Sequence, residues 1–430
     1  METTLTHTGN PWIDCGIIGL CDLWKDKSKI QPEGDVNVHW RNDQVVLEAA
    51  NPEELNHFLE STFEEIKSTF YIERTRNSVC ILDRKKRQFK VVPKINLVSV
   101  VGFLFSGGDL KVKYGAKEPL ETGLMKKYEE FRRLYKGRRN VDFKVKKDEK
   151  NKKEYVYASE PRYNWPFKIG KEGVCSFCGR RAPCVDIDSN NYPFAVGTNN
   201  FQNFFSNLSL SPKMCLFCEL ASLVAINRII FNLTERRRRL FLAIPQAYSL
   251  GELYDFWHLI TSNIVLKPLN QDSNLLSGGY RYRRLSESVL ATCLELYLQL
   301  ERIKEDAKRI AEADKLKDKV SSKSWHFFMV SKTGQVLLFD SYTYLTDLHR
   351  IFKLFASLGN PHTFKEMFQH LAIQQGREWR NELRDQFAQR ILRSAGLNNV
   401  AERIMWGKSR EGSYVAGLAD FIEHYNIWRG

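Results

Sequence analysis

Two Cys-x-x-Cys motifs are the residues of this chain whose type and spacing most clearly predict chemistry. They are Cys175-Ser-Phe-Cys178 and Cys215-Leu-Phe-Cys218. Two thiolates spaced by two residues fit on one tight turn, and two facing turns supply the tetrahedral sulfur cage that Zn²⁺ prefers. A catalytic zinc keeps an open position for water, whereas four cysteine ligands close the coordination shell. We therefore expect a structural zinc site.

The segment between the two motifs is long for a zinc ribbon. It holds the 36 residues from Gly179 to Met214, whereas ribbons commonly have about 15–20, which indicates an insertion between the knuckles. Cys184 lies in this segment, either as a core thiol or as a replacement for Cys178 in the cage. The motifs could also be a redox pair or ordinary buried thiols.

The other cysteines lack partner spacing. Cys15, Cys21, Cys80 and Cys293 lie in apolar segments, where we expect them to pack in the core. The apolar opening has no basic segment before it, and Asp14 interrupts it, so we do not expect a signal peptide. An odd total of nine cysteines then favours a reducing, cytoplasmic location.

Length and charge narrow the class of protein. A chain of 430 residues with 43% hydrophobic residues predicts two to four compact units with substantial cores. The net charge of +14 makes a polyanion the leading partner, and nucleic acid is the commonest one in the cytosol. No apolar run approaches the roughly 20 residues of a membrane span, so we expect no membrane partner.

The basic residues gather in four clusters that we take as candidate nucleic-acid contacts. These are Arg84, Lys85, Lys86 and Arg87; Arg138, Arg139, Lys144 and Lys146, within a basic stretch from Lys136 to Lys153; Arg236 and Arg237; and Tyr280, Arg281, Tyr282, Arg283 and Arg284. The last cluster interleaves aromatic rings with arginines, which can stack on bases while binding phosphates. The first and third clusters could equally be solvated charges at a hairpin tip and a helix end. Separate clusters favour a long track along a duplex or a displaced strand over a single pocket.

One loop between the zinc knuckles could read bases. Asn199, Asn200, Gln202 and Asn203 supply amide groups that hydrogen-bond base edges, and phenylalanines among them could enter a base stack. Arg180 and Arg181 could hold the neighbouring phosphates. The alternative is a turn in which the asparagines bond their own backbone.

The pattern along the chain predicts an α+β fold: a mixed N-terminal domain with an inserted four-cysteine zinc knuckle and a C-terminal helical bundle. The opening is apolar, with glycines where small residues allow close packing. Hairpins are expected around Asn42-Asp43, at Arg84–Arg87 and around Thr333-Gly334, and helices from Asn51-Pro52 and Ser286. The expected units are 1–170 (α+β, with basic hairpin and arm), 171–222 (the four-cysteine zinc-binding region), 223–346 (α+β, with basic loops and a long helix) and 347–430 (helices).

The C-terminal unit should be helical throughout, with helices at 364–373, 379–394 and 400–427 among others. Its arginines would form a basic face if they are exposed: Arg377, Arg380, Arg384, Arg390 and Arg393. No catalytic motif stands out in the sequence, since it has no Walker loop, GxSxG, HExxH or adjacent His-Asp pair. Nine histidines are dispersed singly. We therefore expect a binding subunit in preference to an enzyme.

The opening Thr-Gly-Asn-Pro-Trp-Ile-Asp-Cys-Gly (residues 8–16), followed far downstream by the two cysteine pairs, resembles the CXXC–CXXC family of CRISPR-associated proteins. This family supplies the large subunit of type I Cascade complexes, chiefly of the I-B kind. The order of α+β region, zinc knuckle and terminal helices is similar over most of the chain. The basic loops lie between these landmarks, where the family varies, and are not carried over by position.

The resemblance implies a non-catalytic subunit that joins the crRNA complex and its backbone and small subunits. Such a subunit recognises the protospacer-adjacent motif in double-stranded target DNA, promotes strand separation and recruits a helicase-nuclease. Only about 80 residues follow Asp347, so the terminal bundle is short, or separate small subunits complete it.

Two other classes of protein fit the same sequence. A free-standing zinc-containing regulator should recognise a specific duplex by itself, often as a dimer with a reading helix. A nuclease with an unrecognised site should cut nucleic acid when a divalent metal is added. A large subunit should instead need crRNA and its partner proteins.

Overall fold

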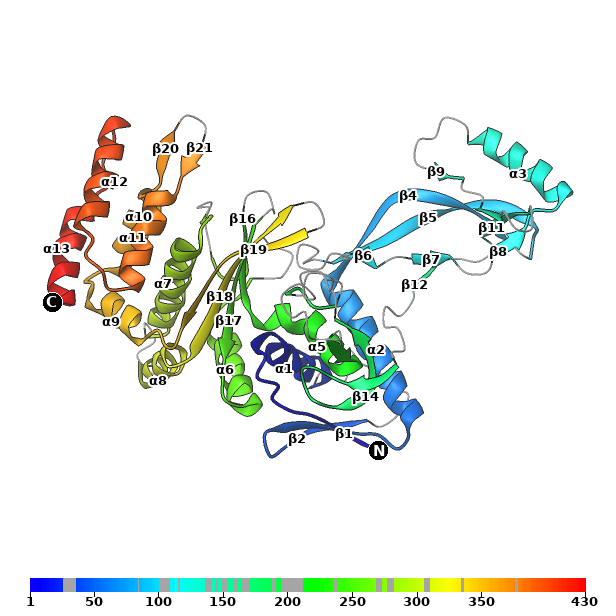
Figure 1. Ribbon diagram of the computed structural model, residues 1–430, viewed down its shortest axis with the longest axis horizontal. Coiled ribbons are helices and arrows are strands. Elements are labelled where there is room, and N and C mark those ends of the chain that lie inside the picture. The colour runs from blue at the N-terminus through cyan, green and yellow to red at the C-terminus, as the bar shows by residue number, and fades with distance from the viewer. Residues whose placement is uncertain are drawn as a thin grey trace, which may run out of the picture.

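The computed structural model describes residues 1–25, 36–83, 85–99, 109–110, 112–114, 117–135, 141–143, 146–148, 153–157, 161–163, 171–187, 191–194, 212–234, 239–267, 273–276, 282–304, 310–333, 336–375 and 378–430. Within these residues the fold is mixed α+β, with a cluster of four cysteines and a group of C-terminal helices, which confirms the expected fold class. Figure 1 shows an elongated molecule, in which a central sheet lies between an arm built on a long β-hairpin and the C-terminal helices. None of the described helices is both long enough and apolar enough to cross a membrane.

Four antiparallel strands form the central sheet, in the order β16-β17-β18-β19. Their bounds are Ile230–Thr234, Arg239–Gln246, Ser324–Thr333 and Val336–Leu345. The last two strands are the hairpin expected at Thr333-Gly334. Trp325 and Phe327 of β18 are buried on the face that helices α6 (Leu250–Asn263) and α7 (Leu285–Lys304) cover. Helix α7 is the helix expected from Ser286.

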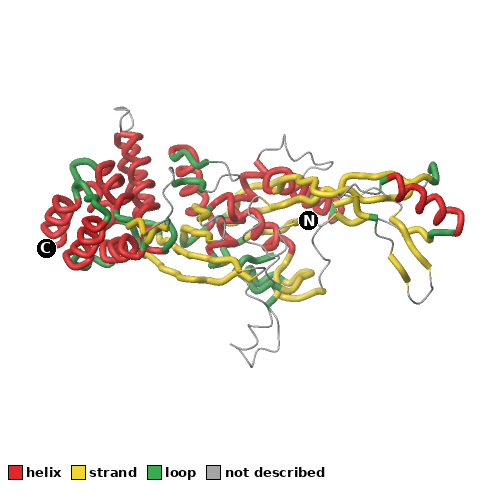
Figure 2. The backbone as a smooth tube through the Cα atoms, turned by 90° about the horizontal axis from the view of Figure 1, so that it is seen from above, coloured by secondary structure: helices red, strands yellow, loops and turns green. Residues whose placement is uncertain are grey.

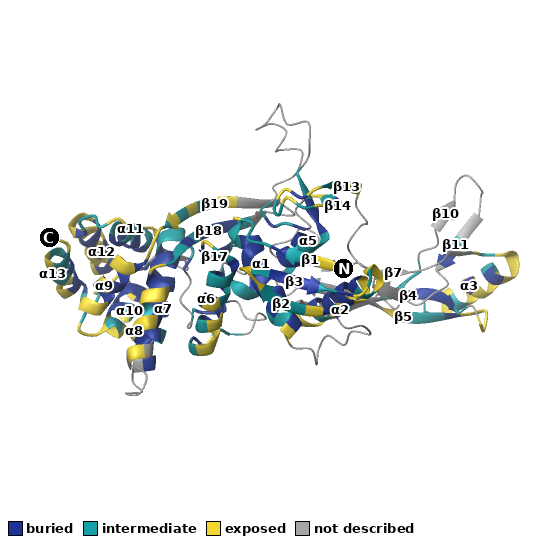
Figure 3. Cartoon of the chain, turned by 90° about the horizontal axis from the view of Figure 1, so that it is seen from below, coloured by how far each residue is buried: buried dark blue, intermediate teal, exposed yellow. Residues whose placement is uncertain are grey.

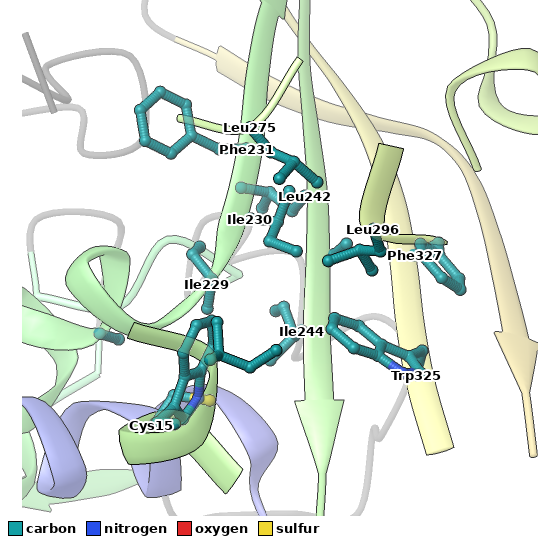
Figure 4. Close-up of a cluster of buried hydrophobic side chains, with 14 of the residues drawn as sticks. Cys15, Ile229, Ile230, Phe231, Leu242, Ile244, Leu275, Leu296, Trp325 and Phe327 are labelled. Carbon is teal, nitrogen blue, oxygen red and sulfur yellow. The ribbon is translucent and has the colours of Figure 1, made fainter. Parts of the chain in front are cut away.

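The opposite face of the sheet packs against helix α1 (Pro11–Lys25) at strand β17. Figure 4 shows Cys15 and Ile229 on the side of β17 that carries Ile244, whereas Trp325 lies on the other side. Successive side chains of a strand point to opposite faces. The two halves of the core therefore meet at β17, which is buried on both sides.

The apolar opening forms the start of α1. Asn10 caps the helix, because its Oδ1 accepts from the backbone N–H groups of Trp12 and Ile13 at 3.1 Å each. The indole N–H of Trp12 donates to the carbonyl and hydroxyl oxygens of Ser222, at 3.1 and 3.0 Å. The backbone N–H and hydroxyl of Thr8 both donate to Asp14 at 2.8 Å, which fixes the loop before the helix.

Glycines let α1 approach helix α5 (Leu216–Val224) at the distance of backbone contact. A Cβ added to Gly16 would lie 1.9 Å from the carbonyl oxygen of Ala221, and one added to Gly19 would lie 2.6 Å from Cγ1 of Val224. These glycines confirm the close packing expected of the opening. After α5 the chain continues through the short 3₁₀ helix η1 (Ala225–Arg228) into the central sheet.

The N-terminal strands form a second sheet. Strand β3 (Gln44–Glu48) lies between β1 (Glu2–Leu5) and β2 (Asn37–Arg41). Asn42 and Asp43 join β2 to β3 with φ of 46° and 62°, a left-handed pair that asparagine and aspartate tolerate in tight hairpins. Helix α2 (Pro52–Phe70) follows, and its N-cap Asn51 accepts from the backbone N–H of Glu54. The expected hairpin and helix start are both confirmed.

The arm is the long antiparallel pair β4 (Tyr71–Asp83) and β5 (Gln88–Ser99), which confirms the hairpin expected at Arg84–Arg87. Helix α3 (Thr122–Leu134) packs at its outer end (Figures 1 and 2). A small core of its own joins these elements: Cys80, Leu82, Phe89, Leu124, Tyr128 and Val156. Short strands complete the arm: β6 (Asp109–Leu110), β7 (Val112–Tyr114), β8 (Lys117–Pro119), β9 (Val141–Asp142), β10 (Lys146–Asp148), β11 (Lys153–Tyr157) and β12 (Pro161–Tyr163).

The C-terminal part is helical with one small hairpin. Its helices are α9 (His349–Ser357), α10 (Pro361–His370), α11 (Glu382–Leu392), α12 (Asn398–Arg410) and α13 (Leu418–Arg429). Helix α8 (Ile310–Ser321) precedes β18 in the chain and packs against α7 and α9. The helix expected at 379–394 is shorter than predicted and the one expected at 364–373 lies three residues earlier, because the strands β20 (Ile373–Gln375) and β21 (Glu378–Arg380) pair between α10 and α11. An aromatic pattern that suits a helix face also suits a short strand, which is why the sequence did not separate them. The single helix expected at 400–427 is instead two helices, α12 and α13.

Arg384 holds this bundle to α7. Its Nε donates to Glu287 at 2.5 Å, and the two side chains are 2% and 0% exposed. Its Nη1 also donates to the carbonyl of Gln369 at 3.1 Å. The prediction that Arg384 contributes to an exposed basic face is therefore wrong, because a buried carboxylate requires a buried cation beside it. Arg390 donates to the carbonyl of Gly396, whereas Arg393 is exposed.

Replacing Gly16 with alanine should lower the free energy of unfolding by about 3 kcal/mol, since its Cβ would collide with backbone atoms that cannot rotate away. Urea denaturation followed by circular dichroism measures the change. The matched control is Gly123→Ala in helix α3, where nothing lies within 4 Å of the added Cβ and the substitution should be neutral or slightly stabilising. Equal stability of the two variants would contradict the close α1–α5 contact.

Candidate metal centre

The sulfur atoms of Cys175, Cys178, Cys215 and Cys218 all lie within 4.8 Å of one another. The Sγ atoms of Cys178 and Cys215 are 3.7 Å apart. Tetrahedral Zn–S bonds of about 2.3 Å place neighbouring sulfurs about 3.8 Å apart, so the cage has room for an ion of that size. Three of the four cysteines are buried and Cys178 is half-buried. The structure thus brings together the four cysteines that the spacing predicted, in an arrangement that could hold a metal ion.

The first knuckle is the turn between strands β13 (Lys171–Val174) and β14 (Arg181–Asp186). Gly179 has φ of 71°, a left-handed conformation that glycine adopts without strain. Its N–H donates to the carbonyl of Cys175 at 2.9 Å, and the Cys175 N–H donates to the carbonyl of Arg180 at 2.9 Å. These bonds reverse the chain so that both thiols of the motif point to one side.

The second knuckle is a strand that runs directly into a helix. Strand β15 (Lys213–Cys215) pairs with β14, and Cys215 is the N-cap of α5, with Cys218 in its first turn. The unpaired N–H groups and dipole of a helix N-terminus favour a thiolate. Reciprocal bonds between Ser176 and Lys213 join the two knuckles: the Ser176 N–H donates to the Lys213 carbonyl, and the Lys213 N–H to the Ser176 hydroxyl.

Charge explains why four thiols this close favour a cation. Hydrogen bonds from the neighbouring thiols lower the pKa of Cys175, first from Cys178 and then from Cys215, whereas the bond to Cys175 raises the pKa of Cys218. Without a cation the thiols share their protons, because four thiolates in contact would repel one another. A divalent ion removes that repulsion and fills the tetrahedral shell, which leaves no ligand position for a substrate.

The remaining cysteines lie in the core, as expected. Cys184 is 4% exposed on β14, opposite Cys215 in the strand register, and its sulfur is not part of the cluster. Burial raises the pKa of Cys184, and it raises those of Cys80 and Cys293 to about 12. Cys15 and Cys21 are also buried. These thiols are neutral packing groups near pH 7.

The basic residues of the arm that the sequence predicted to contact nucleic acid lie in different structural settings. Lys85 and Lys86 are exposed at the β4–β5 turn, where their backbone N–H groups donate to Asp83 at 3.1 and 3.2 Å. Arg87 also lies in this turn and pairs with Glu121 at 3.4 Å while remaining 63% exposed. Lys146, from the basic stretch between Lys136 and Lys153, belongs to strand β10, which pairs with β11. The turn thus keeps three cations accessible to a polyanion.

Tyr282 and Arg284, two of the described residues of the aromatic-arginine cluster before α7, make internal contacts. Tyr282 is 5% exposed and stacks on Phe368, with the guanidinium of Arg384 4.8 Å from its ring centre. Arg284 donates to Glu382 at 2.5 Å. The prediction that Tyr282 stacks on a base is therefore wrong in this arrangement. The sequence showed an aromatic beside arginines but could not show that helices α10 and α11 cover it.

Arg180, expected to hold a phosphate, instead ties the first knuckle to the N-terminal sheet. Its Nη2 donates to the carbonyl of Thr4, and its guanidinium lies 5.0 Å from the ring centre of Phe217. Arg181 is exposed at the start of β14. Arg283 is half-buried, its backbone N–H donates to Glu287 at 2.5 Å, and its carbonyl accepts from Arg239 at 3.1 Å. The remaining predicted contacts lie outside the described residues: Arg84, Arg138, Arg139, Lys144, Asn199, Asn200, Gln202, Asn203, Arg236, Arg237, Tyr280 and Arg281.

Sequence reasoning missed a group of aromatic residues on the open face of the central sheet. Phe339, Tyr342 and Tyr344 of edge strand β19 are 38%, 52% and 43% exposed. The available signal was the pair Tyr342 and Tyr344, because residues two positions apart in a strand share one face. Phe339 lies three positions before Tyr342 and joins their face through the register shift at Met329/Val330. Nothing else in the sequence indicated that this face of the sheet is exposed and the other one buried.

No family model matches the chain, and no curated protein is significantly similar to it.

Replacing Cys175 or Cys218 with serine should remove bound metal and destabilise the protein, because metal binding and local folding are coupled at such sites. Elemental analysis of the purified protein, with thermal unfolding before and after chelation, measures both effects. Cys184→Ser is the matched control, since this thiol is equally buried but lies outside the cage. A metal-free wild-type protein whose four thiols react freely in the native state would rule the site out.

Proposed function

We propose that this protein binds nucleic acid as the non-catalytic large subunit of a type I Cascade complex, similar to the CXXC–CXXC family of CRISPR-associated proteins. The observation that carries the proposal is the contact between the two landmarks of that resemblance. The opening motif at residues 8–16 forms the start of α1, and α1 packs on α5, whose first turn holds the second cysteine pair. Two motifs far apart in sequence thus belong to one structural unit.

The structure around this contact gives a role to several residues of the opening motif, which supports the resemblance. Gly9 has φ of 73°, Asn10 caps the helix, and Pro11 occupies its first position. Trp12 bonds Ser222 near the end of α5, and Gly16 allows the backbone contact. The opening motif and the paired cysteines together therefore specify the unit formed by α1, α5 and the cysteine cage.

The ion proposed for the cage is zinc. Four thiolates in tetrahedral arrangement suit Zn²⁺ or iron, and zinc is the usual ion of isolated structural knuckles with four cysteines. Its role here is to fix α5, and through α5 the position of α1, with no part in chemistry.

The charge of the chain supports a nucleic-acid partner. The net charge is +14, and the described cations of the arm turn are exposed. In the proposed complex the chain acts in the cytoplasm. It joins crRNA and the backbone and small subunits, reads the flanking motif of double-stranded DNA, promotes strand separation and recruits the helicase-nuclease.

The test is to purify the chain alone and together with crRNA and the neighbouring Cascade subunits, and then to measure binding to duplexes with every flanking trinucleotide. We expect stable assembly and motif-dependent binding only in the complex. Tight binding of a defined duplex by the chain alone would favour a regulator. Cleavage of nucleic acid by the purified chain in the presence of Mg²⁺ or Mn²⁺ would favour a nuclease.

Neutralising Lys85 and Lys86 with glutamine should weaken duplex binding for all sequences alike. The slope of log affinity against log salt should fall by roughly one unit for each phosphate interaction that the substitutions remove. Fluorescence anisotropy over a range of salt concentrations measures it. Lys353→Gln, an exposed lysine on α9, is the control and should leave the slope unchanged. An identical slope in the arm variant would remove the arm turn from the nucleic-acid surface.

A further inference from the structure

An aromatic strip crosses the open face of the central sheet. We define it as Phe194, His326, Phe328, Phe339, Tyr342 and Tyr344. Its rings follow one another at centroid distances of 5.3 Å from Phe339 to Phe194, 5.2 Å from Phe194 to Phe328, 4.9 Å from Phe328 to Tyr342, and 4.9 Å from His326 to Tyr344. Figure 3 shows β19 as an exposed edge of the sheet.

The strip belongs to the half of this face that α1 and α5 leave open. Along β18 the side chains alternate: Trp325 and Phe327 are fully buried under α6 and α7, whereas His326 and Phe328 are half-buried on the opposite face. Exposed rings on β19 continue this face to the edge of the sheet. A contiguous apolar surface of this kind marks an interaction site.

The rings of the strip are held in place before any partner binds. The imidazole of His326 lies between two polar partners, with Nδ1 2.9 Å from the Tyr342 hydroxyl and Nε2 2.7 Å from Oε1 of Gln246. Burial lowers the pKa of His326, so the ring is neutral at pH 7. These bonds fix the orientation of the Tyr342 ring, which reduces the entropy lost on stacking.

The strip is also continuous with the candidate metal centre. The ring centroid of Phe194 lies 5.3 Å from that of Trp12 in α1 and 5.4 Å from that of Tyr192. Tyr192 contacts Phe177 of the first knuckle at 5.0 Å, and its hydroxyl accepts from Asn10 at 2.9 Å. Contacts through Tyr192 thus connect one end of the strip to the metal centre and to Asn10, the N-cap of α1.

We propose that the aromatic strip binds single-stranded nucleic acid by stacking its unpaired bases on Phe339, Tyr342 and Tyr344. Rings on an open sheet face, spaced along two strands, accept bases of any sequence because every base has a π-face. The inference rests on the proposed nucleic-acid function but assigns a different surface and a different form of nucleic acid from the arm turn.

Charge selects a nucleic acid over an apolar protein partner. The chain has a net charge of +14, and Arg239, the last residue of the Arg236–Arg239 run, opens β17 at the Phe339 end of the strip. Arg239 pairs with Ser331 in the strand register, next to the Val330–Phe339 pair, and its side chain lies 3.6 Å from Asp340. Arg239 remains 35% exposed although it also donates to the carbonyl of Arg283 at 3.1 Å. A cation at one end of a row of rings suits a phosphate backbone that carries stacked bases.

The test uses the full chain, at one fixed salt concentration, with short fluorescein-labelled oligothymidine and oligouridine strands and with an abasic strand of the same length. Tyr342→Ala and Tyr344→Ala should each weaken binding to both base-carrying strands at least about fivefold. Binding to the abasic strand, which keeps its phosphates, should not change. Tyr342→Phe keeps the ring but loses the hydroxyl bond to His326, so it should bind more weakly than the wild type and more tightly than the alanine variant, whereas Tyr342→Leu keeps apolar bulk without a ring face and should bind as the alanine variant does.

Tyr414→Ala is the matched control, because this tyrosine is 85% exposed in the segment between α12 and α13. Photocrosslinking of a 5-iodouracil strand, followed by mass spectrometry of the peptides, should identify residues of β18 or β19. Equal weakening in the alanine variants for base-carrying and abasic strands, or wild-type affinity in all of them, would overturn the proposal.

Duplex binding by the assembled complex is measured in parallel to separate the two proposals. If duplex binding persists while the strip variants bind single strands normally, the strip inference fails alone, and a protein partner becomes the remaining occupant. If neither the chain nor the complex binds any nucleic acid, the proposed function fails as well.

Discussion

The backbone contact between α1 and α5 is the constraint on which the rest of this structure depends. Gly16 has no room for a Cβ because the carbonyl of Ala221 occupies that space. Helix α5 carries the second cysteine pair at its N-terminus, and α1 covers one face of strand β17. One contact therefore sets the metal centre, the N-terminal motif and the central sheet in a common frame. A bound ion would secure this frame at the N-terminal end of α5.

Burial decides which basic residues of this chain can meet a polyanion. Arg384 and Arg180 both occur in sequence settings that favour a basic surface, yet Arg384 is buried against a carboxylate and Arg180 donates to a backbone carbonyl. A guanidinium offers five donors in a fixed plane, so it is well suited to joining elements across an interface. The cations of the arm turn differ because they lie at the tip of a hairpin, where their side chains remain exposed.

The proposed functions place different tasks on different parts of the fold. The cysteine cage fixes elements and leaves no coordination site for a substrate, the arm turn presents charge at the end of a long hairpin, and the aromatic strip presents ring faces on a rigid sheet. Charge without rings binds a duplex backbone, whereas rings need bases that are free of their pairing partners. A protein that has both surfaces on one frame is suited to nucleic acid that changes between paired and unpaired states.

The sequence by itself determined the elements whose signal is local. The four cysteines, the Asn42-Asp43 turn, the Asn51 cap and the hairpin at Arg84–Arg87 were each predicted, because spacing, caps and turn residues act within a few positions of the chain. Tertiary structure alone decided which side chains are covered. Tyr282 was predicted to be open and is buried under α10 and α11, whereas Tyr342 and Tyr344 passed unnoticed and are exposed. The pattern of a strand gives the period of its two faces, but only the packing of distant helices decides which of those faces meets water.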